Sequence, residues 1–156
     1  MNFQNKLIGC LQAFSNRTAI EYGQMQMSYA SLLAKSNAIT RSLLTLILDM
    51  VRVVGIQMSY NPDLICAMIG VMNARCTFVF LDGALPDERL KTLLADLDLK
   101  YVITASNANR LNKIPEAEKL QFFYFDQLTE AVQEKEAEEI MYPEFDGEDS
   151  LYVYFT

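Results

Sequence analysis

The sequence predicts an α/β fold built on a mostly parallel, helix-covered sheet. The first indication is a β-branched apolar run at 51–58, which has the composition of a buried strand. The second follows at once: Asn61 as a cap, Pro62 at a first helical position and Asp63 in a first turn together favour a helix start. The third is that short strands and helices alternate from there on, which is the pattern of βαβ units.

The N-terminal third predicts a helix, a small hairpin and a second helix. The helix expected over 2–13 has one apolar face, and the longer helix expected over 29–48 has a broad apolar stripe. Gly23 lies between two short runs and marks a hairpin turn, and Ser28 is a suitable N-cap for the long helix. The expected elements are a helix over 2–13, strands over 18–22 and 24–27, and a helix over 29–48.

The remaining chain continues the alternation. The helix expected over 62–74 is apolar on most sides, so we expect it to be deeply buried. Pro86, with acids directly after it, predicts the start of the next helix. The further expected elements are strands over 77–81, 101–104, 121–125 and 150–155, and a short helix near 106–111.

An acidic surface segment at 130–149 leads to the final strand. It contains nine acids and one base, Lys135, whereas the other residues of the chain are nearly balanced in charge. A solvated helix end followed by a loop is the simpler interpretation of such a segment. A docking surface for a basic partner is the alternative.

Composition excludes several classes of function. With 13 Lys and Arg against 20 Asp and Glu, the net charge is −7, so we expect no nucleic-acid partner. The chain has no histidine, which removes the commonest general base and metal ligand. The longest apolar run, 64–72, is too short to span a bilayer, so we expect no membrane segment.

The three cysteines and six glycines narrow the chemistry further. Cys10, Cys66 and Cys76 form no C-x-x-C pair and lie among apolar neighbours, which predicts buried thiols, no zinc site and a reducing, cytoplasmic location. The glycines form neither G-x-G-x-x-G nor a P-loop. We therefore assign no catalytic residue, no metal ligand and no cofactor from these patterns, and the length of 156 residues suits one domain.

Three segments, taken in order, resemble the N-terminal part of the adenylate-forming (AMP-binding, acyl-activating) enzymes, and most closely the adenylation domains of nonribosomal peptide synthetases. Residues 14–20 and 27–32 resemble the opening of that family. Residues 54–56 and 77–104 resemble the part that contains A-Y-x-P-I-D-P and P-x-E-R-I. Residues 149–156 resemble D-N-L-A-Y-I-I-Y-T.

The sequence departs from the family pattern at structural positions. The family reads K-A-G-x-A-Y where this chain has residues 73–78, so Arg75 stands in place of a glycine. Phe80 stands in place of a proline, and Ser31 in place of a glutamate. These differences indicate a divergent member with the fold retained.

The resemblance implies a role for Thr156. In the family this threonine opens the glycine-rich phosphate loop T-S-G-S-T-G-x-P-K-G, so Thr156 is our candidate cofactor-binding residue. The complete enzymes use ATP and Mg²⁺ to convert an amino or other carboxylic acid into an acyl-adenylate, and then transfer the acyl group to a carrier-protein thiol. The phosphate loop is absent from the 156 residues, so we expect this chain alone to be inactive.

Three hypotheses remain open from the sequence. The first is an N-terminal scaffold segment whose partner is the remainder of an adenylation domain or a complementing chain, with self-association through exposed apolar surface when that partner is missing. The second is a non-catalytic interaction or regulatory protein derived from this family. The third, an independent flavodoxin-like nucleotide-binding domain, lacks the glycine loop that it would need.

Overall fold

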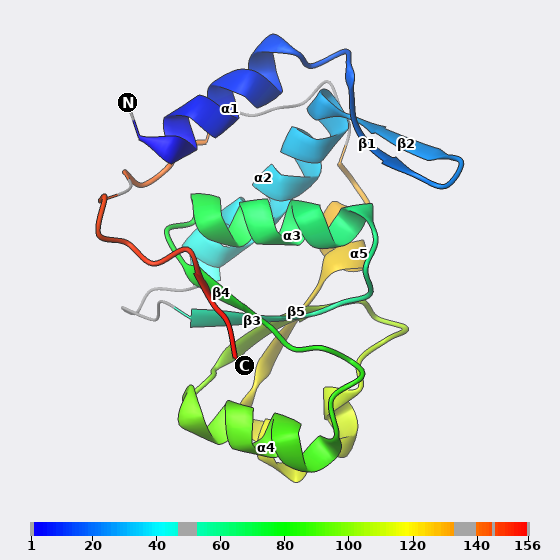
Figure 1. Cartoon of the computed structure of the whole chain (residues 1–156), viewed down its shortest axis with the longest axis vertical. Helices are drawn as coiled ribbons and strands as arrows, with labels where there is room; N and C mark the ends of the chain where they lie inside the picture. Colours follow the sequence, from blue (N-terminus) through cyan, green and yellow to red (C-terminus); the bar gives the residue numbers. More distant parts are fainter. Residues whose placement is uncertain (1, 47–52, 133–139, 145, 156) are drawn as a thin grey trace.

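The computed structural model describes residues 2–46, 53–132, 140–144 and 146–155. A five-stranded sheet forms the middle layer, with helices on both faces and a separate two-stranded hairpin near the N-terminus (Figure 1). All four strand pairings within the five-stranded sheet are parallel. The predicted α/β class with a parallel, helix-covered sheet is therefore confirmed.

The sheet is built around its first strand, β3 (Val53–Gln57), which is hydrogen-bonded on both sides. The chain runs from β3 through a helix to one neighbour and then crosses to the other neighbour, so the strand order is β6-β5-β3-β4-β7. Val54 and Ile56 point to the same face of this central strand and are fully buried under the helices that cover that face. The other strands are β4 (Thr77–Phe80), β5 (Tyr101–Thr104), β6 (Gln121–Tyr124) and β7 (Tyr152–Val153).

The two faces of the sheet carry separate hydrophobic cores. The larger core lies under α1, α2, α3 and α5, and the smaller one lies under α4 and two 3₁₀ turns, η1 and η2 (Figure 1). The helices are α1 (Phe3–Ala13), α2 (Tyr29–Leu46), α3 (Pro62–Asn73), α4 (Asp87–Asp96) and α5 (Phe125–Thr129), with η1 (Leu111–Lys113) and η2 (Pro115–Lys119).

Helices α2 and α3 cross at very short range. A Cβ atom added to Gly70 of α3 would lie 2.6 Å from the Cβ of Ile39 and 2.8 Å from the carbonyl oxygen of Ser36, both in α2. The hydroxyl of Thr40 donates to the carbonyl oxygen of Gly70 at 3.0 Å across the same contact. Only glycine fits this crossing, which holds the helix pair against the sheet.

The local signals in the sequence are confirmed where they were strongest. Asn61 caps α3 by accepting from the backbone N–H groups of Asp63 and Leu64. Gly23 has φ +61° in the turn between β1 (Thr18–Tyr22) and β2 (Met25–Ser28). The hydroxyl of Ser28 accepts from the backbone N–H of Ser31 at the start of α2, as expected of an N-cap.

Four expectations are wrong or incomplete. The helix expected near 106–111 is a loop followed by η1 and η2, because the buried side chain of Gln57 in β3 hydrogen-bonds to the backbone of Ala108 and Arg110. The strand expected over 121–125 ends at Tyr124, and α5 begins at Phe125. The final strand is limited to Tyr152–Val153. Cys10 is exposed on α1, whereas Cys66 and Cys76 are buried as expected.

Candidate functional site

The candidate site begins at β7, the strand that leads toward Thr156. Thr156 itself lies outside the described residues, so its assignment remains a prediction. β7 lies at one edge of the described sheet, where it pairs with β4 alone, through Phe78 opposite Tyr152 and Val79 opposite Val153. The arrangement of residues 146–155 therefore determines where the chain points as it leaves the sheet.

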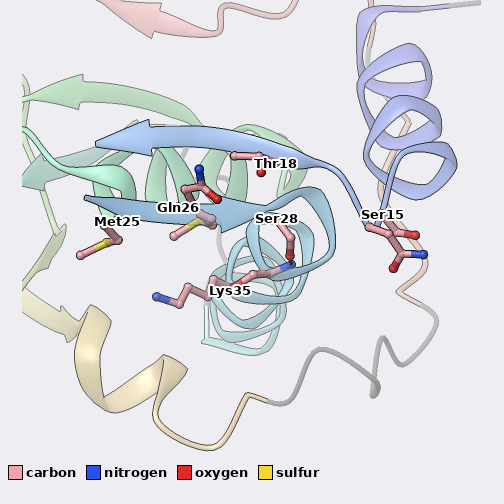
Figure 2. Close-up of a pocket in the computed structure, with 9 residues that line it drawn as sticks. Ser15, Thr18, Met25, Gln26, Ser28 and Lys35 are labelled. Atoms are coloured by element: carbon pink, nitrogen blue, oxygen red, sulfur yellow. Dashed lines mark hydrogen bonds between the residues drawn. The ribbon is translucent and has the colours of Figure 1, made fainter. Parts of the chain in front are cut away.

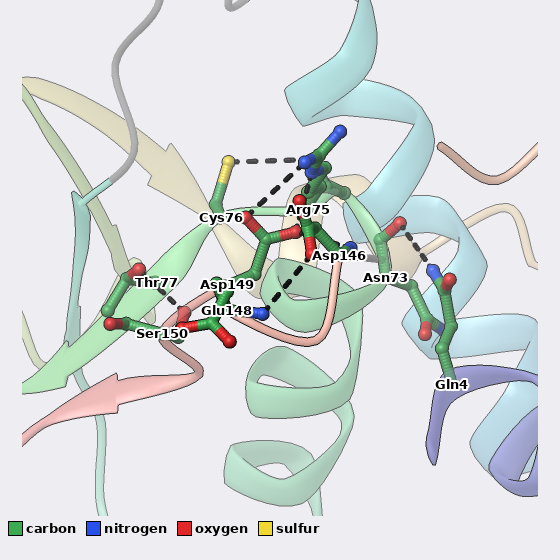
Figure 3. Close-up of polar contacts among 10 residues, drawn as sticks. Gln4, Asn73, Arg75, Cys76, Thr77, Asp146, Glu148, Asp149 and Ser150 are labelled. Carbon is green, nitrogen blue, oxygen red and sulfur yellow. Dashed lines mark hydrogen bonds and ion pairs between the residues drawn. The ribbon is translucent and has the colours of Figure 1, made fainter. Parts of the chain in front are cut away.

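Contacts from the start of β4 hold β7 in place. The backbone N–H of Phe78 donates to the carbonyl oxygen of Leu151 at 3.1 Å. The hydroxyl of Thr77 donates to the carbonyl oxygen of Ser150 at 2.8 Å, as Figure 3 shows. The rings of Phe78 and Tyr152 stack with centroids 6.0 Å apart. Together these contacts fix the register of a strand that is only two residues long.

A charged contact lies just before this strand. Arg75, in the turn between α3 and β4, donates from Nε to Oδ2 of Asp149 at 2.7 Å and from Nη2 to Oδ1 at 3.4 Å (Figure 3). The hydrogen bond to Asp149 raises the pKa of Arg75, because it stabilises the charged guanidinium. Asp149 also accepts from the backbone N–H of Asp146 at 2.9 Å.

The two faces of β7 differ in burial. Val153 and Phe155 pack against the smaller hydrophobic core, on the side of α4. Tyr152 and Tyr154 are 62% and 79% exposed, and β7 has no further strand beside it in the described sheet. An edge strand with exposed aromatic side chains is a surface on which another strand can add.

A groove of about 320 Å³ lies past the carboxyl ends of β4 and β7. Asp82 and Arg89 bring one carboxylate and one guanidinium to its wall, and its other walls are apolar and aromatic. Asp82 accepts from the backbone N–H of Ala84, which shapes the turn after β4. The lining residues are Tyr60, Phe80, Asp82, Leu85, Arg89, Leu93, Val153, Tyr154 and Phe155.

The usual ligand crevice of a doubly wound sheet is filled in this protein. That crevice lies at the carboxyl ends of β3 and β5, where the chain changes direction across the sheet. The side-chain carbonyl of Gln57 accepts from the hydroxyl of Thr104 at 3.0 Å and from the backbone N–H of Arg110 at 3.3 Å. Its amide donates to the carbonyl oxygen of Ala108 at 3.1 Å. This network counts against an independent flavodoxin-like nucleotide site.

A cavity of about 470 Å³ lies elsewhere, between the hairpin and α2. Figure 2 shows Lys35 of α2 and side chains of β2 beside it. The ammonium of Lys35 is held by Oδ1 of Asp63 at 2.9 Å and lies 5.9 Å from the centre of the Phe125 ring. The cationic group beside the cavity is thus already paired with a carboxylate. Residues from the two segments that resemble the opening of the family, 14–20 and 27–32, line this cavity.

Two further kinds of chemistry are metal binding in the described residues and nucleophilic attack by the buried thiol of Cys66. Within 2–46, 53–132, 140–144 and 146–155, no group of three or more acidic or cysteine side chains could hold a metal ion. Burial raises the pKa of the Cys66 thiol to about 12, so this cysteine is inert rather than nucleophilic.

The described part of the acidic segment is anchored rather than free. The hydroxyl of Tyr142 donates to Oδ1 of Asn37, which is buried in α2, at 2.7 Å. Burial raises the pKa of Tyr142, so its hydroxyl remains a donor at neutral pH. With the Asp149 contact, this gives the segment two fixed points on the fold, whereas residues 133–139, which hold four of the nine acids, lie outside the described residues.

Sequence comparison identifies the family. The sequence pattern of the AMP-binding enzymes matches residues 10–156, so this chain belongs to the AMP-binding enzyme family. It is 30% identical to part of tyrocidine synthase 3 of Brevibacillus parabrevis over 90% of this chain and 2% of that protein. It is 34% identical to a PKS-NRPS hybrid synthetase, ATPKS, of Aspergillus niger over 59% of this chain and 5% of that protein. The chain therefore spans only a small part of these relatives.

Solved structures identify the same fold. The N-terminal subdomain of NpsA from Klebsiella oxytoca superposes with a TM-score of 0.79 at 18% identity, over 99% of this chain and 38% of that one. Its complex with 3-hydroxybenzoyl-AMSN gives a TM-score of 0.80 at the same identity. The fold is that of the N-terminal subdomain of adenylation domains of nonribosomal peptide synthetases, as the resemblance implied.

No helix in the described ranges is both long and apolar enough to cross a membrane.

Proposed function

We propose that this chain supplies the N-terminal scaffold of an adenylation domain that activates an amino or other carboxylic acid with ATP. The parent reaction forms an acyl-adenylate, which is then transferred to a carrier thiol. The observation that carries the proposal is the family match over residues 10–156. The scattered thiols, two of them buried, agree with a cytoplasmic location.

ATP and Mg²⁺ belong to this proposal for the complete enzyme only. The residues described here do not fit a nucleotide–metal centre, because the crevice between β3 and β5 is closed by Gln57 and no glycine-rich loop follows a strand. The role we assign to the chain's own residues is structural: they position β7. The sheet, its helices and the Arg75–Asp149 contact hold β7 so that the residue at 156 starts the phosphate loop in a defined direction.

The same reasoning predicts that these 156 residues alone do not bind ATP. Calorimetry with Mg-ATP over a panel of amino acids tests this, and we expect no saturable heat. Binding at micromolar ATP would contradict this prediction. It would indicate an ATP site in the groove beside β7 or in the cavity beside the hairpin. In that case, Arg89→Ala and Lys35→Ala would separate the groove beside β7 from the cavity beside the hairpin.

The partner in this proposal is the remainder of an adenylation domain, which would add to the open edge of β7. A carrier protein is the second partner: a solved relative, NpsA-ThdA of Klebsiella oxytoca, is an artificially fused Adenylation-PCP di-domain. If the edge meets no partner, its exposed tyrosines favour self-association. Light scattering over a concentration series tests this last point, and a monomer at every concentration would contradict it.

Complementation tests the proposal as a whole. The downstream portion of a related adenylation domain, added in cis or as a separate chain, should restore pyrophosphate release in the presence of a cognate amino acid. Val153→Asp places a charge against the smaller core beside the edge and should abolish release. Met25→Asp is the matched control, because Met25 is 57% exposed on the separate hairpin and should leave release unchanged.

A second candidate function, a non-catalytic interaction protein, has one observation in its favour: nine acids fall within 130–149. On this alternative, complementation fails although the two chains bind. Neutralising Glu134, Glu136, Glu138 and Glu139 to glutamine should then weaken binding to a basic partner. If release is restored and the neutralised variant keeps it, the adenylation proposal stands and the acidic segment is solvated surface.

A further inference from the structure

The turn between α3 and β4 contains an unusual backbone conformation. Arg75 has φ +60°, in the left-handed region that L residues other than Asn and Asp adopt at a cost. Among the described non-glycine residues only Asp98, with φ +46°, shares this property. Glycine would occupy position 75 without strain, so the arginine side chain has to supply something that offsets the cost.

The arginine side chain supplies a two-point contact to the chain just before β7. Its Nε and Nη2 atoms reach both carboxylate oxygens of Asp149, which lies 74 residues later in the sequence. The same carboxylate accepts from the N–H of Asp146, and the N–H of Asp149 donates to the carbonyl oxygen of Asp146 at 3.0 Å. The guanidinium therefore binds a turn that is already closed, and the turn brings Ser150 and Leu151 to β4.

We propose that Arg75 is a positioning residue that holds β7 on the sheet edge through Asp149. β7 has two residues in the ladder and one neighbouring strand, so the backbone alone holds it weakly. The consequence for an active enzyme rests on the proposed function, since β7 precedes the phosphate loop only there. The placement of the strand itself does not depend on that function.

This arrangement predicts that strand placement and global stability respond differently to one substitution. Arg75→Gly relieves the backbone strain and removes the ion pair, and these two effects oppose each other in the stability of the whole fold. Only the second effect acts on β7. The global unfolding midpoint should therefore change little, while amide hydrogen exchange in residues 146–155 should become about tenfold faster.

Hydrogen exchange of the 156-residue chain, read by mass spectrometry of its peptides without any nucleotide, tests the proposal. Asp98→Gly is the matched control, because it places glycine at the other left-handed position and should leave exchange in 146–155 unchanged. Asp149→Asn should accelerate that exchange at least as much as Arg75→Gly does, because Asp149 also accepts from the N–H of Asp146, and the double variant should be no faster than Asp149→Asn alone. In all variants, exchange in β3 should stay slow.

Two results would overturn the proposal. One is unchanged exchange in 146–155 in Arg75→Gly, and the other is full additivity of Arg75→Gly with Asp149→Asn, which would mean that the two side chains act separately. If Arg75→Gly does not fold, Arg75→Lys replaces it, since it keeps the charge but loses the paired donors and should give an intermediate acceleration. Because no nucleotide is present, a failure of the proposed adenylation function leaves these outcomes unaffected.

Discussion

The centre and the edge of the sheet are held in different ways. β3 is paired along its length with two neighbours, and Val54 and Ile56 are fully buried in the larger core. β7 pairs two residues with one neighbour and leaves Tyr152 and Tyr154 exposed. Burial thus specifies the centre, whereas a few side-chain contacts from the α3–β4 turn specify the edge. Substitutions should consequently act globally at the centre and locally at the edge.

The largest expected loss of stability comes from forcing apart helices α2 and α3, which cover the centre of the sheet. Gly70→Ala would place a methyl group 2.6 Å from Ile39 and 2.8 Å from a backbone oxygen of α2, so the helices must move apart. We expect a loss of about 3 kcal/mol in the free energy of unfolding, measured in urea.

Gly9→Ala is the control, because a Cβ there meets nothing within 4 Å. That change in α1 should stabilise the protein by about 1 kcal/mol or less. A loss under about 1 kcal/mol for Gly70→Ala would show that the crossing can relax, and that the centre is less rigid than its packing implies.

The next effect concerns alkaline pH and the buried thiol of Cys66 in α3. Burial raises the pKa of Cys66 from 9.0 to about 12, partly opposed by Lys35 and reinforced by Asp63. Since the folded pKa is the higher one, the thiol contributes no pH dependence below pH 9, and stability is lost as pH rises from 9 toward 12. At pH 10.5 the loss should be about 2 kcal/mol.

Urea unfolding at several pH values checks this linkage. Cys66→Ala should remove the thiol's share of the alkaline slope, and Cys10→Ala, which removes an exposed thiol, is the matched control. Equal slopes in the wild type and in Cys66→Ala would mean that water reaches the centre of the fold more readily than its packing indicates.

The smallest expected effect on stability comes from the same substitution, threonine to valine, made once at the centre and once at the edge of the sheet. Thr104→Val removes the buried hydrogen bond to Gln57 and should cost about 1 kcal/mol of stability. Thr77→Val removes the bond to the carbonyl oxygen of Ser150, an exposed residue whose oxygen can bind water instead, and should cost about 0.5 kcal/mol or less. Thermal unfolding of both variants measures the difference, and an equal or reversed order contradicts it.

The sequence predicted those elements of the fold that local chemistry determines. The cap of α3 at Asn61 and the hairpin turn at Gly23 were predictable, because a capping hydrogen bond and a positive φ depend on only a few neighbouring residues. The segment at 106–111 was predicted wrongly because its shape comes from Gln57, about fifty residues earlier, which binds its backbone. Local periodicity carries no information about such a contact.

The candidate site was less accessible from the sequence. Its strand was expected, yet the contact between Arg75 and Asp149 joins residues 74 positions apart, and no local pattern encodes that pairing. One signal was available: an arginine stands where the family pattern has glycine. The structure explains it, since the position requires positive φ and the side chain found there binds the chain that leads into β7.

The position of β7 in the sheet also sets an order of events during synthesis. The contacts that fix β7 join residues 73 and 74 positions apart, whereas β3, β4, β5 and β6 follow one another closely along the chain. At about 5–20 residues per second, a ribosome needs on the order of several seconds to make the intervening chain. During that interval the edge of β4 is open, so a nascent chain offers β4 as a template to any other extended segment nearby until β7 has been synthesised.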